Sequence, residues 1–98
     1  MERLRRLVIT TFPEDPYTAK KIVQGESSFK PHVCGPKNSN NTIDCGLWQI
    51  NDIHLPELNR LGLNRFNPED ATKFARVLYE RNGGWGDWVY YTHHLAIR

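Results

Sequence analysis

The sequence predicts an α+β fold in a single domain over residues 1–98, mostly helical, with a small antiparallel hairpin or sheet flanking a cleft. Three observations predict it. Apolar residues recur at helical spacing, helix-start signals precede several of these runs, and a turn-rich stretch over residues 32–46 lies between them. The 98 residues suit one core, since a chain of this size buries about 60–65% of its unfolded surface.

The N-terminal part holds one open assignment and one clear helix. Residues 1–12 combine helically spaced apolar residues with a β-branched run, so a helix and a strand both remain open. Asp15 and Pro16 then predict a helix start, with Asp as N-cap and Pro at the first position. The positions that share one face of this helix at i, i+3, i+4 and i+7 are Ala19, Ile22, Val23 and Glu26.

Glu26 therefore falls on an apolar face, near the predicted end of the helix, where a structural role would call for Leu. A carboxyl at such a place loses hydration, which raises its pKa. The partial negative charge of the helix C-terminus acts in the same direction. A second interpretation stays open, in which the helix frays before Glu26 and leaves the side chain in solvent.

Residues 32–46 are rich in turn formers and predict a small hairpin between Val33 and Ile43, with its tip near Asn40. Asp44 would lie on the returning strand among Asn and Thr side chains, where we expect it to stay ionised. It would otherwise serve only to stabilise the turn. Two carboxyls in different surroundings are what cleavage of a glycosidic bond requires.

Two cysteines, Cys34 and Cys45, lie on either side of this turn-rich segment. Closure of the hairpin would bring them together, so a disulfide and a pair of buried free thiols both remain open. A zinc site that adds His32 or His54 to the two cysteines matches no common ligand spacing. We therefore expect neither a metal nor a cofactor.

The segment Leu47–Ile50 alternates apolar and amide residues and predicts a strand that Asn51 ends. Gln49 and Asn51 would point to one side, where their amides suit sugar hydroxyl and N-acetyl groups. The alternative is a core strand that carries two solvated amides.

Three helices are predicted in the C-terminal half. Residues 55–61 form a short helix that Gly62 ends. Asn67 and Pro68 begin the clearest helix, which Gly83 ends, and its buried stripe comprises Ala71, Phe74, Ala75 and Leu78. A last helix is predicted over Asp87–Ile97. Trp88, Tyr91 and Leu95 share one of its faces, and we expect His93 and His94 on the surface.

Charge and hydropathy exclude some classes of function. The net charge of +2 is too small to indicate a nucleic-acid binder, but it suits mild attraction to an anionic polymer such as a bacterial cell wall. No run of eighteen apolar residues is present, so we expect no membrane insertion. The first twelve residues lack the apolar run and cleavage site of a signal peptide.

Two motifs in order carry a family resemblance: Glu26-Ser27-Ser28-Phe29, and then Asp-Cys-Gly-Leu-Trp-Gln-Ile-Asn over residues 44–51. This combination resembles the lysozyme-like superfamily, above all the soluble lytic transglycosylase-type domains and the small muramidases of bacteria and phage tails. The resemblance covers roughly residues 15–92, and the further matching segments are Ile53-His54, Pro68–Tyr79 and Gly84–Trp88.

The resemblance implies a role for each matching residue. Glu26 takes the place of the catalytic acid, and Asp44 matches the aspartate of animal-type lysozymes, which many transglycosylases lack. The residues implied in sugar binding or in packing against the acid are Gln49, Asn51, Asn41, Trp88 and Tyr91. The four-disulfide framework and paired tryptophans of animal lysozymes are absent, as is the Tyr-Asn-Ala-Gly of transglycosylases.

The implied substrate is the peptidoglycan glycan strand, cut between N-acetylmuramic acid and N-acetylglucosamine. Hydrolysis with Asp44 as stabiliser or nucleophile, and a transglycosylase reaction with Glu26 as the sole acid and base, both remain open. A non-catalytic wall-binding or structural module is the third alternative. We expect a monomer, or one domain of a larger phage or secretion-associated assembly, that acts on the cell wall outside the cell, in the periplasm or on a virion.

Overall fold

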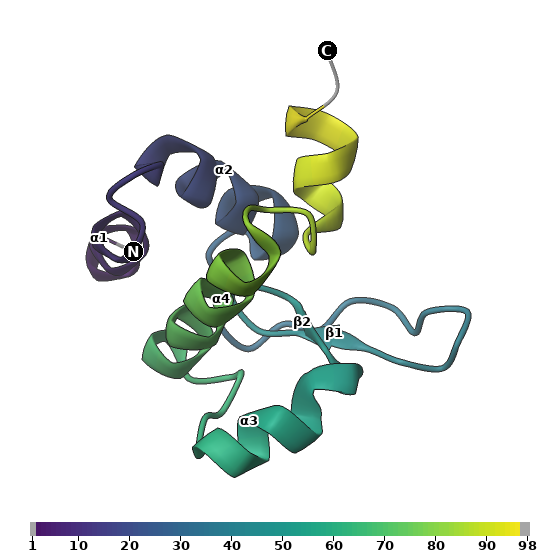
Figure 1. The fold of residues 1–98 in the computed structure, drawn as a ribbon. Coiled ribbons are helices and arrows are strands. Elements are labelled where there is room, and N and C mark those ends of the chain that lie inside the picture. The colour runs from purple at the N-terminus through teal and green to yellow at the C-terminus, as the bar shows by residue number, and fades with distance from the viewer. Residues whose placement is uncertain (1, 97–98) are drawn as a thin grey trace.

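The computed structural model describes residues 2–96, and within them lie five helices and helical turns, a two-stranded sheet and a last helical segment at the outside of the molecule (Figure 1). This confirms the α+β expectation. In chain order the elements are α1 (Glu2–Thr11), α2 (Pro16–Ser27), β1 (Asp44–Cys45), β2 (Ile50–Asn51), the 3₁₀ turn η1 (Asp52–His54), α3 (Leu55–Leu61), α4 (Pro68–Asn82) and η2 (Tyr91–Leu95).

The N-terminal assignment that the sequence leaves open is a helix. α1 packs against α2 and α4, with Val8 fully buried and Phe12 buried directly after the helix end. Its helical apolar spacing thus outweighs the β-branched run, because a helix can bury that stripe against two neighbours.

The predicted start of α2 is confirmed. Asp15 accepts a hydrogen bond from the backbone N of Thr18, and Pro16 is the first helical residue. The helix ends at Ser27, where Ser28 adopts a left-handed conformation and its N–H bonds to the carbonyl of Gln24. Glu26 therefore lies inside the last turn of an intact helix and not in a frayed end.

The predicted strand over Leu47–Ile50 is wrong, because residues 46–49 form a tight turn between β1 and β2. The strands pair antiparallel, with Asp44 opposite Asn51 and Cys45 opposite Ile50. Leu47 and Trp48 are both fully buried, so no strand alternation exists. Positive φ angles of 88° at Gly46 and 50° at Gln49 turn the chain.

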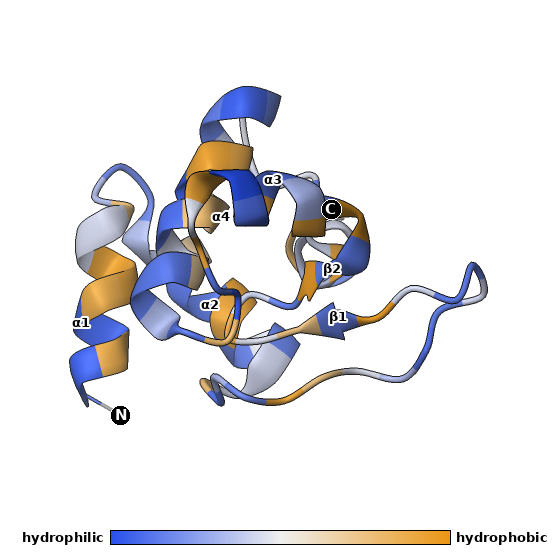
Figure 2. Cartoon of the chain, turned by 90° about the horizontal axis from the view of Figure 1, so that it is seen from below, coloured by the Kyte–Doolittle hydropathy of each residue, from blue (hydrophilic) through white to orange (hydrophobic). Residues whose placement is uncertain are grey.

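The segment before β1 folds back as the turn signals predict, although as a loop with little regular strand. Asn38 donates its backbone N–H to the carbonyl of Thr42, which places the tip near Asn40. A bridge pairs Cys34 with Cys45, and the two form a disulfide. In Figure 2 this loop extends away from the helices beyond β1.

The two central helices follow the sequence prediction. Gly62 ends α3 with φ of 72°, and Asn67 caps α4 by accepting a hydrogen bond from the backbone N of Asp70 at 2.9 Å. The predicted stripe of α4 is buried, namely Ala71, Phe74, Ala75 and Leu78. This helix supplies one wall of the core.

Trp48 is the centre of the aromatic core. Its ring is fully buried and lies 5.3 Å from Phe12, 6.2 Å from Trp85 and 5.4 Å from Trp88, measured between ring centroids. Its indole N–H donates to the Thr72 hydroxyl of α4 at 3.0 Å. The turn between the strands is thereby fixed to the helices.

The last helix differs from the predicted one over Asp87–Ile97. Helical geometry begins at residue 89 and becomes a π-helix over η2, in which Ala96 N bonds to the carbonyl of Tyr91, while Ile97 lies outside the described residues. Tyr91 and Leu95 pack against the core, as predicted. The expected surface positions of His93 and His94 are confirmed.

Within residues 2–96, no helix is both long and apolar enough to cross a membrane.

Replacement of Gly46 by Ala tests the turn. A Cβ there would lie 2.1 Å from the carbonyl oxygen of Arg65, at a φ of 88°. A left-handed conformation alone costs an L-residue about 1–2 kcal/mol, and the backbone would also have to move. We expect Gly46→Ala to lower the free energy of unfolding by about 3 kcal/mol or more in urea denaturation.

The matched control is Gly62→Ala, at a φ of 72° with no atom within 4 Å of the added Cβ. It carries the conformational cost without the steric one, so its loss should stay at about 1–2 kcal/mol. Equal losses for the two variants would contradict the close packing of the turn.

Candidate active site

Glu26 lies in the last turn of α2, on the face that also carries the buried Ile22 and Val23, and its own side chain is partly buried. Oε2 accepts a hydrogen bond from the backbone N of Tyr90 at 3.0 Å. No cation pairs with this carboxyl among residues 2–96. Its surroundings are therefore those of an acid taken out of water without compensation by a positive charge.

Burial raises the pKa of Glu26 above its ordinary value of 4.5. The hydrogen bond from Tyr90 opposes this by stabilising the charged form, and the negative charge of Asp44 raises the pKa further. The balance keeps a proton on Glu26 at a higher pH than an exposed glutamate would.

Tyr90 is the residue that donates to Glu26, and sequence reasoning missed it. A Cβ built on Gly25 would lie 2.2 Å from a ring carbon of Tyr90, so this ring lies directly on the helix beside the acid. Gly25 was the available signal, because a glycine inside a helix often marks a close approach by another segment. Helical spacing pointed to Trp88 and Tyr91 instead.

Asp44, on β1, is partly buried and held on both carboxylate oxygens. Oδ1 accepts from the amide of Asn51 at 2.8 Å, and Oδ2 accepts from the amide of Asn38 at 3.1 Å. The next residue, Cys45, is joined to Cys34 by the disulfide, so the backbone at Asp44 is anchored as well. The carboxylate is thus fixed in direction, in more polar surroundings than Glu26.

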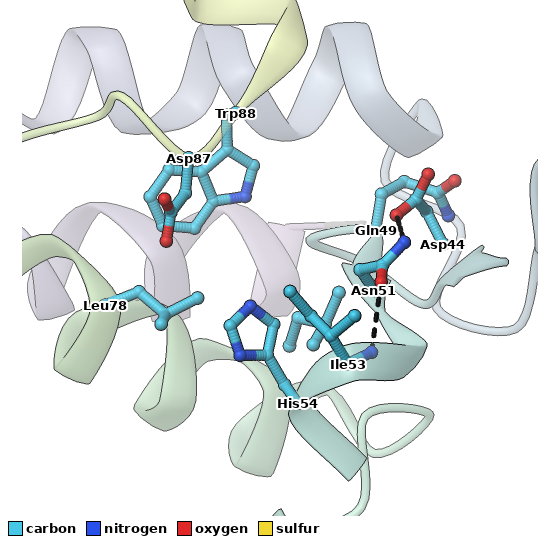
Figure 3. Close-up of a pocket in the computed structure, with 9 residues that line it drawn as sticks. Asp44, Gln49, Asn51, Ile53, His54, Leu78, Asp87 and Trp88 are labelled. Carbon is cyan, nitrogen blue, oxygen red and sulfur yellow. Dashed lines mark hydrogen bonds between the residues drawn. The ribbon is translucent and has the colours of Figure 1, made fainter. Parts of the chain in front are cut away.

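A hollow of about 150 Å³ lies between the sheet and the segment before η2 (Figure 3). Asp44 and Asn51 lie on one side of it, Asp87 and Trp88 on the other, and His54 between them. Its lining residues are Asp44, Gln49, Ile50, Asn51, Ile53, His54, Leu78, Asp87 and Trp88. Glu26 does not line this hollow itself, but its pKa responds to Asp44, which does.

The amide side chains predicted to bind sugar line the hollow, but they also bond within the protein. Asn51 donates to Asp44 and Thr42 and accepts from the backbone N of Ile53. Gln49 donates to the carbonyls of Val33 and Gly46. Asn51 therefore positions Asp44, a task that its place opposite Asp44 on the paired strands makes possible.

The other predicted binding residues are divided. Trp88 is buried, lines the hollow and donates its indole N–H to the carbonyl of Trp48 at 3.0 Å. Asn41 is an exposed residue of the loop tip and Tyr91 packs against the core, so neither lines the hollow. The spacing of these residues in the sequence did not distinguish Trp88, which lines the hollow, from Asn41 and Tyr91, which do not.

Two polar lining residues, His54 and Asp87, were not proposed as site residues from the sequence. The His54 ring lies 5.4 Å from the Phe74 ring, edge to face, and Asp87 accepts a hydrogen bond from Asn82 at 2.8 Å. Asp87 directly precedes Trp88 in the sequence, but only the fold brings His54 and Asp87 to the same hollow as Asp44 (Figure 3). Among residues 2–96 no group of three or more potential ligands could hold a metal ion.

The raised pKa of Glu26 gives a prediction for stability. A carboxyl whose pKa is higher in the folded than in the unfolded state stabilises the fold at low pH, and this contribution is lost as the pH rises through the folded pKa. Glu26→Gln removes the buried charge. We therefore compare the melting temperature of the variant minus that of the unchanged protein at two pH values. This difference should be more positive near neutral pH than well below pH 4.5.

Glu14→Gln is the contrasting control. The hydrogen bond with Arg76 lowers the pKa of Glu14 to about 2. Glu14 therefore contributes stability above pH 4.5 that disappears as the pH falls towards about 2. Its loss should destabilise the protein near neutral pH. A difference in melting temperature for Glu26→Gln that does not change with pH would contradict the burial of its charge.

Comparison with known proteins agrees with this geometry. The family model described as "Transglycosylase SLT domain" matches residues 9–94. Lysozyme P of Drosophila melanogaster is 36% identical over 83 residues, which covers 70% of this chain and 59% of that protein. Lysozyme 1 of Musca domestica is 30% identical over 83 residues, with the same two shares.

The chain thus spans about three fifths of the length of these curated relatives. The family match is more extensive, since it begins within α1 and ends within η2. It includes Glu26, Asp44 and every residue that lines the hollow. The chain belongs to the transglycosylase SLT domain family, within the lysozyme-like superfamily.

Proposed function

We propose that this chain degrades peptidoglycan by cleaving the β-1,4 bond between N-acetylmuramic acid and N-acetylglucosamine, with Glu26 as the general acid. The observation that carries the proposal is the state of Glu26, a partly buried carboxyl that pairs with no cation among residues 2–96 and whose pKa burial raises. A general acid must hold its proton at working pH, and such surroundings provide this. Membership of the family supports the same role.

In the proposed reaction Glu26 donates its proton to the glycosidic oxygen as the bond to the muramic acid breaks. The sugar that remains acquires oxocarbenium character, which a nearby carboxylate stabilises or traps. Glu26, now ionised, then acts as a base on the attacking group. The hydrogen bond from Tyr90 is present to stabilise that ionised form.

We further propose hydrolysis, with Asp44 as the stabilising or nucleophilic carboxylate. The support is that both Asp44 oxygens are held by amide donors, and that the residue lines the hollow near Trp88. A carboxylate that is already oriented acts on developing positive charge without reorganisation. Water would be the acceptor, and the product a reducing end.

The second candidate is a lytic transglycosylase reaction, which the description of the matching family favours. Here the C6 hydroxyl of the same muramic acid replaces water and leaves a 1,6-anhydro end. Glu26 would carry both proton transfers, and Asp44 would be dispensable. In either case the chain acts at the bacterial cell wall, as a monomer or as a domain of a larger phage or secretion-associated assembly.

Glu26→Gln tests the acid. The amide keeps the shape of the side chain but cannot donate a carboxyl proton, so we expect the rate of glycan cleavage to fall by about 10²–10⁴-fold. Release of soluble fragments from purified peptidoglycan measures it. Glu57→Gln is a matched control, because Glu57 lies on α3, pairs with Arg81 and does not line the hollow. Equal rates for both variants and the unchanged protein would refute the assignment and favour a non-catalytic module.

Asp44→Asn separates the two reactions. If Asp44 stabilises the intermediate, loss of its charge should slow cleavage by about 10²–10³-fold, as for other preorganised electrostatic groups. Mass spectrometry of the products of the unchanged protein gives the second readout, since an anhydro end is lighter than a reducing end by one water. Near-full activity of the variant together with anhydro products would instead establish the transglycosylase reaction.

A further inference from the structure

A second hollow, of about 230 Å³, lies where α1 and α2 meet the last helical segment. Its six lining residues are Arg5, Lys20, Lys21, Gln24, Phe29 and Tyr90. Three of these are cations, two are aromatic and none is acidic. The hollow is therefore a concentrated positive site on a chain whose net charge is only +2.

The three cations are not neutralised within the part of the chain that the structure describes. Neither Arg5, Lys20 nor Lys21 forms an ion pair there. Arg5 lies 5.6 Å above the Phe29 ring and Lys21 lies 5.2 Å from the Tyr17 ring. Contact with a ring orients a cation but leaves its charge available to an anion.

Arg76 shows the usual alternative in the same molecule. It also lies over aromatic rings, but its guanidinium pairs with both Glu14 and Glu80. The cations of the second hollow differ, because no carboxylate within residues 2–96 forms an ion pair with them. An external anion can take that place.

This hollow adjoins the proposed catalytic acid. Tyr90 belongs to both places, because its ring lines the second hollow while its backbone N donates to Glu26. Gln24 and Lys21 lie two and five residues before Glu26 on α2, which places them towards the other side of this helix, so Tyr90 is the link between the two places. A ligand that reaches from the scissile bond around Tyr90 would meet the cations.

We propose that the second hollow binds carboxylate groups of the peptide stem on the muramic acid beside the scissile bond. The inference rests on the proposed function. The stem is an anionic group attached to the same sugar as the bond that Glu26 would cleave. The site thus selects glycan that carries peptides, and Lys20, Lys21 and Arg5 are its specificity-determining residues.

The charge and the shape of the second hollow both favour a stem carboxylate as its ligand. A carboxylate paired with an ammonium or guanidinium forms charge-assisted hydrogen bonds, which are stronger than neutral ones. The partly exposed Tyr90 suits the short apolar side chains and methylene groups of a peptide, whereas the Phe29 ring is almost fully buried. A phosphate polymer of the cell wall would pair with the cations but would have no apolar group to place against the aromatic side chain.

The experiment compares two substrates and two variants. Peptidoglycan glycan strands are used with their stems and after an amidase has removed them. For Lys20→Gln/Lys21→Gln, we expect kcat/KM on stem-bearing strands to fall about tenfold or more, since the charge-assisted contacts with the stem carboxylates are lost. On stem-free strands the variant and the unchanged protein should be equal.

The matched control is Arg60→Gln/Lys73→Gln, which removes the same charge from exposed positions on α3 and α4. It should leave both rates unchanged. Equal loss on both substrates by the Lys20/Lys21 variant would overturn the inference. So would a loss confined to intact walls that carry phosphate polymers, because the partner would then be that polymer.

A binding measurement keeps this inference separate from the proposed reaction. Calorimetry with Glu26→Gln, which should not turn over, compares a disaccharide that carries a peptide stem with the bare disaccharide. We expect the stem to tighten binding about tenfold, and the added Lys20→Gln/Lys21→Gln change to abolish that gain. Equal affinity for the two ligands would refute the stem site, whereas absence of cleavage by the unchanged protein would refute only the proposed function.

Discussion

The turn over residues 46–49 is the constraint on which the rest of this structure depends. Its two buried carbonyls accept hydrogen bonds from different elements, Leu47 from the Ser27 hydroxyl of α2 at 2.7 Å and Trp48 from the Trp88 indole at 3.0 Å. The Trp48 indole donates to Thr72 of α4 at 3.0 Å. Because buried polar groups must be paired, these bonds fix one short turn against three segments that are distant in the sequence.

The site follows from that arrangement. Ser27 is the neighbour of Glu26, Trp88 comes shortly before Tyr90, and the turn itself joins the strand of Asp44 to that of Asn51. The hydrogen bonds of this turn therefore fix Glu26, Tyr90 and Asp44 relative to one another. Their surroundings still differ, since Glu26 is partly buried and pairs with no cation among residues 2–96, whereas Asp44 is held by two amides. Two carboxyls in such different surroundings can take different roles in one reaction.

The sequence predicted local features well, and contacts between distant segments poorly. The starts of α2 and α4 were predictable because Asp15 and Asn67 act within one turn of the chain. The strand at Leu47–Ile50 was wrong because its apolar residues are buried by tertiary contacts rather than by alternation. The contact of Tyr90 with Glu26 joins residues 64 apart, and no local pattern specifies it. Amphipathic spacing did find Glu26, since it reports which face of a helix is buried.

Partial burial and the negative charge of Asp44 both raise the pKa of Glu26, and its proposed role as the acid depends on this. The most direct measurement is an NMR titration of the side-chain carboxyl carbon of Glu26, in the unchanged protein and in Asp44→Asn. The account predicts a midpoint above the ordinary 4.5 that moves down, but not fully to that value, when the charge of Asp44 is removed, because burial is the larger cause. A midpoint at or below 4.5 in the unchanged protein would contradict it.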